Sequence, residues 1–165
     1  MKKLAFIFAF TLAGALEAQA APTLIERFDD WGVYSFKSEG HTICYVLTKP
    51  KKAEPGNVDH GSNYFLIAPH ADRTQGAYEP QARMGYPLKP NSLVNLQIGN
   101  DHFRMFTRDQ SAWTRTLTRE PELVKAIKGG QEMVLQAISV RGTNTRYSYS
   151  LKGVTAALKR AGKCK

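Results

Sequence analysis

Apolar and polar residues alternate in many short stretches of this chain, and a period of two is typical of β-strands with one buried face. The clearest case lies near the C-terminus, where Thr145, Tyr147, Tyr149 and Leu151 occupy alternate positions. Residues 132–140 form another strand-like stretch just before it, and a short polar turn separates the two. This order predicts a β-hairpin close to the end of the chain.

The same pattern predicts strands along most of the remaining chain. Residues 42–48 are apolar at both sets of alternate positions, so we expect this strand to lie inside a sheet. Prolines and glycines interrupt residues 49–61 and 85–90, and these stretches are predicted to be loops. The further predicted strands cover residues 31–36, 62–68, 78–84, 94–98, 103–107 and 112–116.

Two short helices are predicted beside the strands. Glu120, Pro121 and Glu122 open the first, because proline suits the first turn and acidic side chains suit the positive end of a helix. Residues 151–161 carry apolar side chains at helical spacing, and Gly162 ends this second helix. The strands and helices do not alternate as a parallel sheet requires. The sequence therefore predicts an all-β fold, an immunoglobulin-like antiparallel β-sandwich with a short C-terminal helix, and a small closed barrel is the alternative.

The N-terminal residues 1–20 have the features of a signal peptide. Lys2 and Lys3 precede an apolar stretch that is too short to span a bilayer, and residues 18–20 form an Ala-x-Ala cleavage site. An uncleaved anchor is the alternative interpretation. We therefore expect residues 21–165 to form a single exported domain, periplasmic or associated with the outer surface, with no transmembrane segment after cleavage.

The two cysteines of the chain, Cys44 and Cys164, are expected to form a disulfide, because paired cysteines are usually oxidised in exported proteins. Such a bond would close nearly the whole mature chain into one loop, for which the chain-entropy model gives about 4–5 kcal/mol of stability. A catalytic thiol or a metal ligand is the alternative. No CxxC motif is present, which favours the disulfide.

The chain is basic, with a formal net charge of +9. Without residues 1–20, 21 basic and 13 acidic residues leave an excess of +8. In an exported protein this charge favours phospholipid headgroups, lipopolysaccharide or acidic polymers over nucleic acid as partners; a role in solubility alone is the alternative. The residues predicted to form a surface for an anionic partner are Lys49, Lys51, Lys52, Arg104, Lys152, Lys159, Arg160 and Lys163.

Motifs for catalysis, cofactors or metals are scarce in the sequence. Asp59, His60 and Ser62 place an acid, a base and a hydroxyl together, but a catalytic triad is usually assembled from separate segments. We therefore interpret residues 59–62 as a turn, and we predict no catalytic residue, no cofactor and no metal site. Trp31 and Trp113 lie in or next to predicted strands and are expected to belong to the core.

Several short segments resemble, in their order, the invasion-associated locus B family of bacterial envelope proteins. They are Asp30-Trp31, Cys44, residues 85–88 (Gly-Tyr-Pro-Leu), residues 139–145 (Ser-Val-Arg-Gly-Thr-Asn-Thr), residues 149–153 (Tyr-Ser-Leu-Lys-Gly) and Cys164. The resemblance covers nearly the whole mature chain and implies an exported immunoglobulin-like β-sandwich with no assigned catalytic activity. His60-Gly61 departs from it, since an Arg-Gly pair is expected there, and Arg146-Tyr147 replaces an acidic or small residue.

These observations favour an exported, non-enzymatic envelope protein that binds a macromolecular or anionic partner in the envelope or on a host surface. Two alternatives stay open at this point. One is a periplasmic hydrolase built around Asp59, His60 and Ser62, and the other is a carrier that encloses a small apolar ligand.

Overall fold

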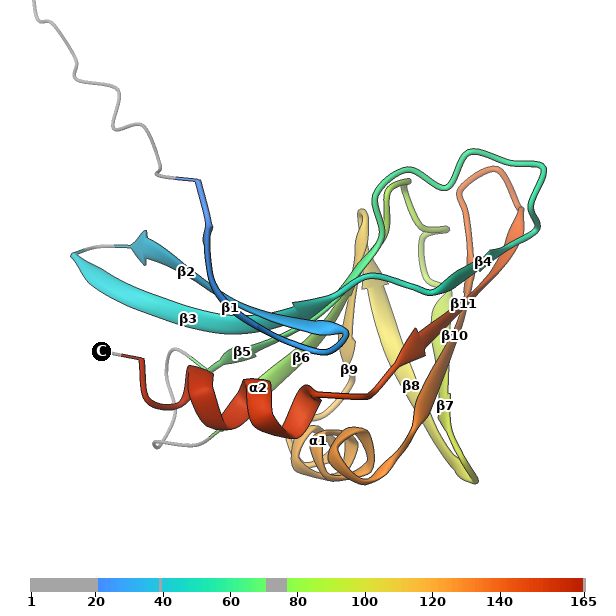
Figure 1. The fold of residues 1–165 in the computed structure, drawn as a ribbon. Coiled ribbons are helices and arrows are strands. Elements are labelled where there is room, and N and C mark those ends of the chain that lie inside the picture. The colour runs from blue at the N-terminus through green and yellow to red at the C-terminus, as the bar shows by residue number, and fades with distance from the viewer. Residues whose placement is uncertain (1–20, 39, 71–76, 165) are drawn as a thin grey trace, which may run out of the picture.

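The computed structural model describes residues 21–38, 40–70 and 77–164, so the predicted signal peptide lies outside the described residues. Strands dominate these ranges, and one helix precedes the last hairpin while another follows it (Figure 1). No helix in the described part of the chain is long and apolar enough to cross a membrane. The elements are β1 (Thr23–Phe28), β2 (Trp31–Ser38), β3 (His41–Thr48), β4 (Lys52–Glu54), β5 (Tyr64–Pro69), β6 (Tyr78–Arg83), β7 (Leu93–Ile98), β8 (Asp101–Arg108), β9 (Ser111–Thr114), α1 (Arg119–Gly129), β10 (Glu132–Ile138), β11 (Asn144–Ser150) and α2 (Val154–Ala161).

The strands form one 11-stranded antiparallel sheet in the order β1-β2-β3-β5-β6-β9-β8-β7-β10-β11-β4. The sheet bends until its two halves face each other, and the helices lie at the open side of this bend (Figure 1). The ring of Phe65 in β5 packs against Tyr149 in β11, with 6.1 Å between centroids, although these strands are far apart in the sheet order. The predicted all-β sandwich with a C-terminal helix is thus confirmed, and both layers belong to one continuous sheet.

Bulky side chains fill the space between the two layers. Trp31, Phe65, Tyr147 and Tyr149 are each fully buried there. The indole Nε1 of Trp31 donates a hydrogen bond of 3.0 Å to the carbonyl oxygen of Ser150, which joins the start of β2 to the end of β11. The prediction that Trp31 belongs to the core is confirmed.

The prediction that Trp113 belongs to the core is wrong. Its neighbours Ala112 and Thr114 point inward and are buried, so the alternation of β9 turns Trp113 to the outer side of the sheet. There the indole ring stacks on Phe106 of β8, with 5.7 Å between centroids. Phe106 is itself 40 % exposed, so this aromatic pair lies at the surface.

Two strands have no clear signal in the sequence. β1 pairs with β2 at the edge of the sheet, and five of its six residues are exposed, so burial imposes no alternation on it. β4 is only three residues long and lies inside the loop predicted from prolines and glycines. It pairs with β11 and forms the opposite edge of the sheet.

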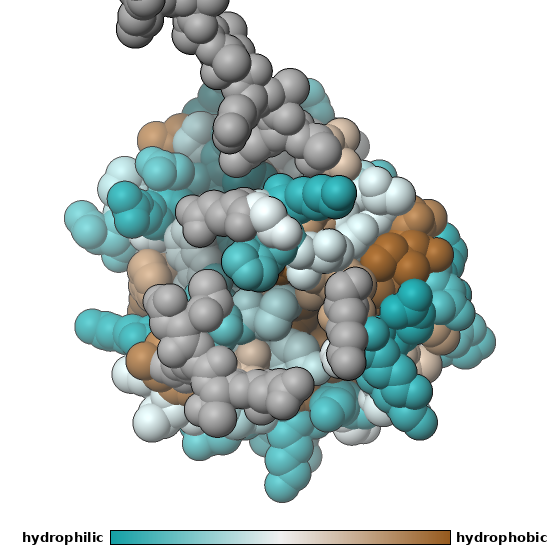
Figure 2. Space-filling view, turned by 90° about the vertical axis from the view of Figure 1, so that its left-hand side faces the viewer, coloured by the Kyte–Doolittle hydropathy of each residue, from teal (hydrophilic) through white to brown (hydrophobic). Residues whose placement is uncertain are grey.

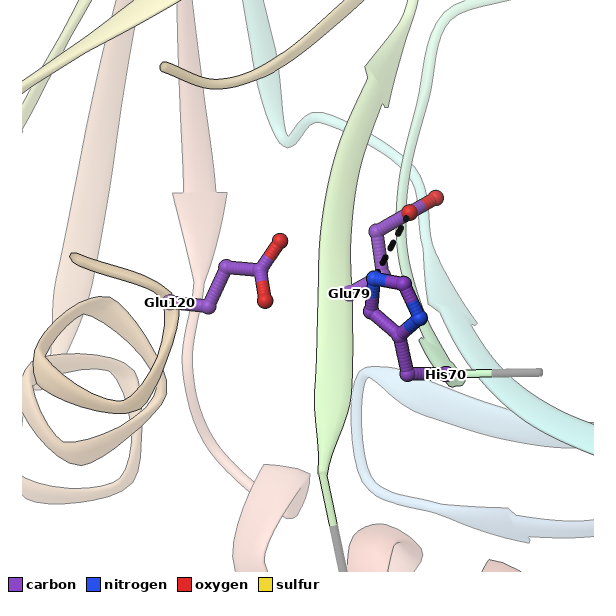
Figure 3. A group of neighbouring side chains, drawn as sticks. All are labelled: His70, Glu79 and Glu120. Atoms are coloured by element: carbon purple, nitrogen blue, oxygen red, sulfur yellow. Dashed lines mark ion pairs between the residues drawn. The ribbon is translucent and has the colours of Figure 1, made fainter. Parts of the chain in front are cut away.

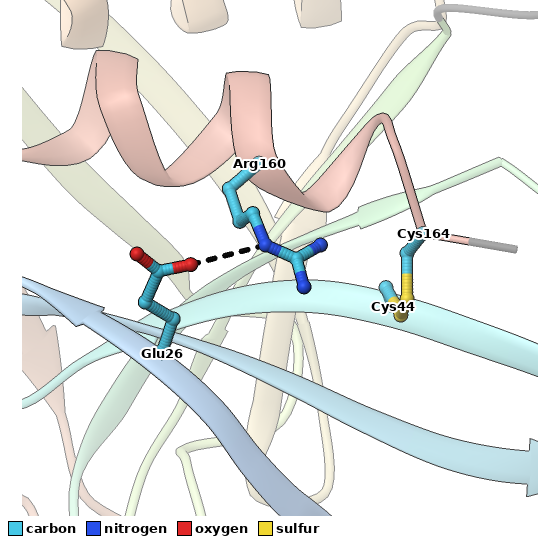
Figure 4. Close-up of a disulfide and its surroundings, with 4 residues drawn as sticks. All are labelled: Glu26, Cys44, Arg160 and Cys164. Carbon is cyan, nitrogen blue, oxygen red and sulfur yellow. Dashed lines mark hydrogen bonds and ion pairs between the residues drawn. A yellow bond between two sulfur atoms is a disulfide. The ribbon is translucent and has the colours of Figure 1, made fainter.

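The predicted disulfide is confirmed and joins Cys44, on the inner side of β3, to Cys164, which follows α2 (Figure 4). The two Cα atoms are 6.1 Å apart, and the bond links positions separated by 120 residues. Arg160 Nε donates a 3.0 Å hydrogen bond to Glu26 Oε2, which ties α2 to β1 beside the disulfide (Figure 4). The alternative of a free catalytic thiol or a metal ligand is therefore wrong.

Gly153 lets the chain turn from β11 into α2. Its φ of +92° is a conformation that favours glycine, and a Cβ atom at this position would lie 2.0 Å from the carbonyl oxygen of Phe28. The amide of Asp30 also donates to Lys152 O at 3.3 Å, so the entry to α2 rests directly on the turn between β1 and β2.

We expect removal of the disulfide in the Cys44→Ala/Cys164→Ala variant to lower the free energy of unfolding by about 2–5 kcal/mol, because the unfolded chain regains the freedom that the bond removes. Urea denaturation monitored by circular dichroism measures this. A reducing agent should destabilise the wild type and leave the variant unchanged. Equal stability of the oxidised wild type and the variant would contradict the structural role of the bond.

We expect Gly153→Ala to destabilise the protein by more than about 2 kcal/mol, because strain at positive φ is combined with a clash against the backbone of Phe28. Gly142→Ala is a matched control. Gly142 also has positive φ, at +83°, but a Cβ atom added there would have no other atom within 4 Å. Thermal unfolding of both variants separates the two effects, and equal losses would show that the contact with Phe28 is unimportant.

Candidate functional site

Three segments of the chain meet at one surface hollow of about 320 Å³, which we call the loop hollow. Its wall combines residues 58–61 from the loop after β4, residues 85–87 after β6 and parts of residues 139–145 at the β10–β11 turn. These segments are far apart in the sequence. The fold alone brings them together, because β5, β6, β10 and β11 end on the same side of the molecule (Figure 1).

Backbone hydrogen bonds hold the segments of the loop hollow in place. Lys89 N donates to Ile138 O and Val140 N donates to Pro87 O, both at 2.9 Å. The loops around Gly61 and Gly85 cross so closely that a Cβ atom on Gly85 would lie 2.4 Å from Ser62 N. Space therefore requires glycine at position 85, and Gly61 has a φ of +57°, a conformation that favours glycine.

The side chain of Asn63 reinforces the same crossing from beneath. It is buried, its Nδ2 donates to His60 O at 2.8 Å, and its Oδ1 accepts from Gly85 N at 3.1 Å. One amide therefore satisfies a carbonyl of one loop and an N–H of the other, and it fixes their relative position.

His60 stands between the loop hollow and the core. Its Nε2 lies 2.9 Å from Pro55 O, and because a carbonyl only accepts, Nε2 is the donor. Its Nδ1 lies 2.8 Å from the hydroxyl of Tyr147, and the two rings meet edge to face at 5.3 Å between centroids. Both ring nitrogens of His60 are thus used in contacts within the protein.

From Tyr147 a chain of hydroxyl groups continues through Tyr86 to Thr145. The Tyr147 hydroxyl donates to Tyr86 at 3.1 Å, Tyr86 lies 2.6 Å from Thr145 Oγ1, and Thr145 donates to Ala137 O at 3.2 Å. Burial raises the pKa of Tyr147 well above its usual range, and the hydrogen bond with Tyr86 raises it further. Tyr147 therefore stays protonated at neutral pH and acts as a neutral hydrogen-bonding group.

The interpretation of residues 59–62 as a turn is confirmed. Asp59 Oδ1 accepts a 2.8 Å hydrogen bond from Gly61 N, as in an Asx turn. His60 bonds to Tyr147 and Pro55, so neither Asp59 nor Ser62 is a hydrogen-bond partner of its ring. These three residues do not form the connected acid, base and nucleophile that hydrolysis by a triad needs.

The structure distributes the predicted basic surface over several places. Lys51 pairs with Asp30 and Lys152 pairs with Asp29 at 3.1 Å, so the β1–β2 turn takes up two of the cations. The hydrogen bond from Lys51 lowers the pKa of Asp30, and a second one from Ser150 adds to the shift. In this part of the molecule, carboxylates offset much of the positive charge.

Two more of these residues are also paired with carboxylates, Lys52 with Glu54 at 2.7 Å and Arg160 with Glu26 at 3.0 Å. The others are less constrained. Arg104 is exposed on β8, and Lys49 Nζ lies 5.5 Å from the centroid of the Tyr64 ring. Lys159 and Lys163 are exposed at the end of α2. The eight predicted residues do not form one continuous patch.

One group of side chains in the described ranges resembles a metal site, namely His70, Glu79 and Glu120 (Figure 3). Their ligand atoms all lie within 4.8 Å of one another. His70 Nε2 lies 3.6 Å from Glu79 Oε2, and Glu120 accepts a 3.3 Å hydrogen bond from Thr114. The three side chains thus bring one imidazole and two carboxylates, one of them buried, close together.

Comparison with known proteins places the chain in a family. The family model for "Invasion associated locus B (IalB) protein" matches residues 31–162, a range that includes all three segments of the loop hollow. The crystal structure of invasion associated protein B from Bartonella henselae is similar, with a TM-score of 0.62 and 15 % sequence identity over 84 % of this chain and 95 % of that one. No curated protein sequence matches. The chain belongs to the invasion associated locus B family.

Proposed function

We propose that this protein is an exported, non-enzymatic envelope protein that binds an anionic partner in the envelope or on a host surface. The observation that carries the proposal is the uneven pairing of its charges. Near α2 and the β1–β2 turn, carboxylates pair with Lys51, Lys152 and Arg160, whereas the exposed Arg83, Arg104 and Arg108 have no carboxylate partner among the described residues. These exposed cations are free to attract other molecules, and they therefore favour an anionic partner.

The bonding at the loop hollow supports a role without catalysis. His60 has both ring nitrogens engaged, and the tyrosine hydroxyl beside it is held protonated by burial. Nucleophilic catalysis needs a base free to take a proton from a nucleophile, and His60 is not placed for this. The filled core argues in the same way against a carrier of a small apolar ligand, because Trp31, Phe65 and Tyr149 occupy the space between the layers.

The predicted signal peptide, the disulfide and the family support export to the envelope, in the periplasm or at the outer surface. The similar structure from Bartonella henselae is described as an invasion associated protein. For this chain we propose the envelope location and the anionic partner, and both can be tested without a host cell.

We expect the mature protein to bind vesicles that contain anionic phospholipid, and to bind lipopolysaccharide, with an affinity that falls steeply as the salt concentration rises from about 0.1 M to about 1 M. Salt screens exposed charges over a distance of about 10 Å at 0.1 M and about 3 Å at 1 M. Co-sedimentation with anionic vesicles and with purely zwitterionic vesicles measures the effect. Absence of binding to both anionic probes, or binding that salt does not weaken, would contradict the proposal.

We expect Tyr147→Phe to lower the free energy of unfolding by about 1–3 kcal/mol, because His60 and Tyr86 each lose a partner at the edge of the core. Tyr149→Phe is the matched control. The Tyr149 hydroxyl is buried and has no hydrogen-bond partner among the described residues, so its removal should change stability by less than about 0.5 kcal/mol or stabilise the fold.

Chemical denaturation gives both values. If Tyr147→Phe leaves stability unchanged but abolishes an activity of the protein, the hydroxyl chain serves chemistry and the non-enzymatic proposal fails.

A further inference from the structure

The outer side of the sheet carries a line of apolar side chains, which we call the outer apolar row. It consists of Leu47 in β3, Leu66 in β5, Trp113 in β9, Phe106 in β8 and Leu93 in β7. Pairing of the strands puts these residues in register: Leu47 opposite Leu66, Leu66 opposite Gln81, Gln81 opposite Trp113, Trp113 opposite Phe106 and Phe106 opposite Leu93. The row therefore crosses the strands in a straight line. Gln81 in β6 fills the one polar position, between Leu66 and Trp113.

A second line runs beside the first, displaced by two residues on each strand. We call it the outer basic row. Tyr64 pairs with Arg83, Arg83 with Ser111 and Ser111 with Arg108, and Lys49 lies over the ring of Tyr64. Two residues of a strand span about 7 Å, so the two rows are close neighbours. Together they make an amphipathic surface on one face of β3, β5, β6, β9 and β8.

Both described helices pack on the opposite, inner side of the sheet. α2 is joined to the inward Cys44 by the disulfide, and α1 buries Leu123, Val124 and Ile127 in the same core. Phe106 is 40 % exposed, and Leu47, Leu66 and Trp113 are only partly buried. This explains why residues 42–48 are apolar on both faces: one side of β3 faces the core and the other belongs to the outer apolar row.

The space-filling view shows the side of the molecule from which the β2–β3 hairpin projects. Apolar side chains reach the surface there in patches that are bounded by hydrophilic ones (Figure 2). Large apolar patches with polar borders are typical of interaction sites. The charge of the border decides which partner fits, and in the outer basic row Lys49, Arg83 and Arg108 have no ion-pair partner among the described residues.

We propose that the outer apolar row and the outer basic row dock this protein on the surface of an anionic phospholipid membrane. Tryptophan and tyrosine side chains favour the headgroup region of a bilayer, and each surface cation adds about 1 kcal/mol of attraction to anionic lipid. A second copy of the chain fits this surface less well. Its own rows would bring the same cations, and neither row contains a carboxylate that could pair with them. This inference rests on the proposed function and names the surface that carries it.

The test uses the full mature protein and vesicles of phosphatidylcholine with and without phosphatidylglycerol. Trp113 is at the outer surface and Trp31 is fully buried, so a blue shift of tryptophan fluorescence on binding reports on Trp113. We expect this shift with the anionic vesicles and none with pure phosphatidylcholine. Binding without the shift would overturn the inference, while the proposed function would stand.

Two double variants each remove two positive charges, but from different places on the surface. Arg83→Gln/Arg108→Gln should weaken binding to the anionic vesicles about 30-fold, as expected for two cations at the membrane surface. Lys159→Gln/Lys163→Gln removes the same charge at the end of α2 and should weaken binding less than about threefold. Equal losses, or a larger loss in the α2 variant, would overturn the inference.

A third variant removes apolar surface and keeps the charge. Phe106→Ser/Trp113→Ser should weaken binding at least about tenfold at unchanged net charge, and circular dichroism confirms that each variant is folded. If light scattering shows that the wild type is a dimer which this variant converts to a monomer, the outer face is a self-association surface and the inference is wrong. If the wild type binds no anionic probe, both this inference and the proposed function are wrong.

Discussion

The closure of a single bent sheet on itself is the constraint on which the structure depends. The disulfide between Cys44 and Cys164, together with the hydrogen bond from Trp31 to Ser150, ties the beginning of the sheet to the end of the chain. α2 fits between these two links and covers the core near β1–β3. Because the same few contacts bring the two halves face to face, the core, the loop hollow and the outer side are all positioned by them.

Each side of the sheet then has its own chemistry. The inner side is filled by large aromatic and aliphatic side chains, and its polar groups at the edge form the chain from His60 to Thr145. The outer side has half-buried apolar side chains beside cations without carboxylate partners among the described residues. Two of the segments that resemble the family, residues 85–88 and 139–145, lie at the loop hollow, where Gly85 and the backbone hydrogen bonds of the loops hold the crossing together. These contacts serve to fold the loops together, and the surface that we propose for a partner is on the outer side of the sheet.

Much of the fold is predictable from the sequence, because alternation and helical spacing are local signals. The C-terminal hairpin, the strands at residues 94–98 and 103–107 and both helices follow from such signals, whereas the disulfide follows from the presence of two cysteines in a chain expected to be exported. β1 and β4 are edge strands with little burial to shape their sequence, and they escape detection. The loop hollow also escapes, because residues near positions 60, 85 and 141 meet only after the sheet has bent.

The outer rows are only partly predictable from the sequence. The apolar residues on both faces of 42–48 are visible in the sequence, but the usual explanation is a strand covered on both sides. The outward position of Trp113 follows from the small, buried neighbours Ala112 and Thr114, a signal that is clear only once the strand is known to be half-buried. The register that aligns Leu66, Trp113 and Phe106 depends on pairing of strands that are not consecutive, and local patterns carry no information about it.

The most direct test of this account is hydroxyl-radical footprinting of the protein with and without anionic vesicles, read by mass spectrometry. Docking through the outer rows predicts that vesicles protect Phe106, Trp113 and Leu66, while Val140, which is 56 % exposed beside the loop hollow, is oxidised equally in both conditions. Protection of Val140 and Tyr86 with unchanged oxidation of Phe106 and Trp113 would contradict it, and would place the contact surface at the loop hollow.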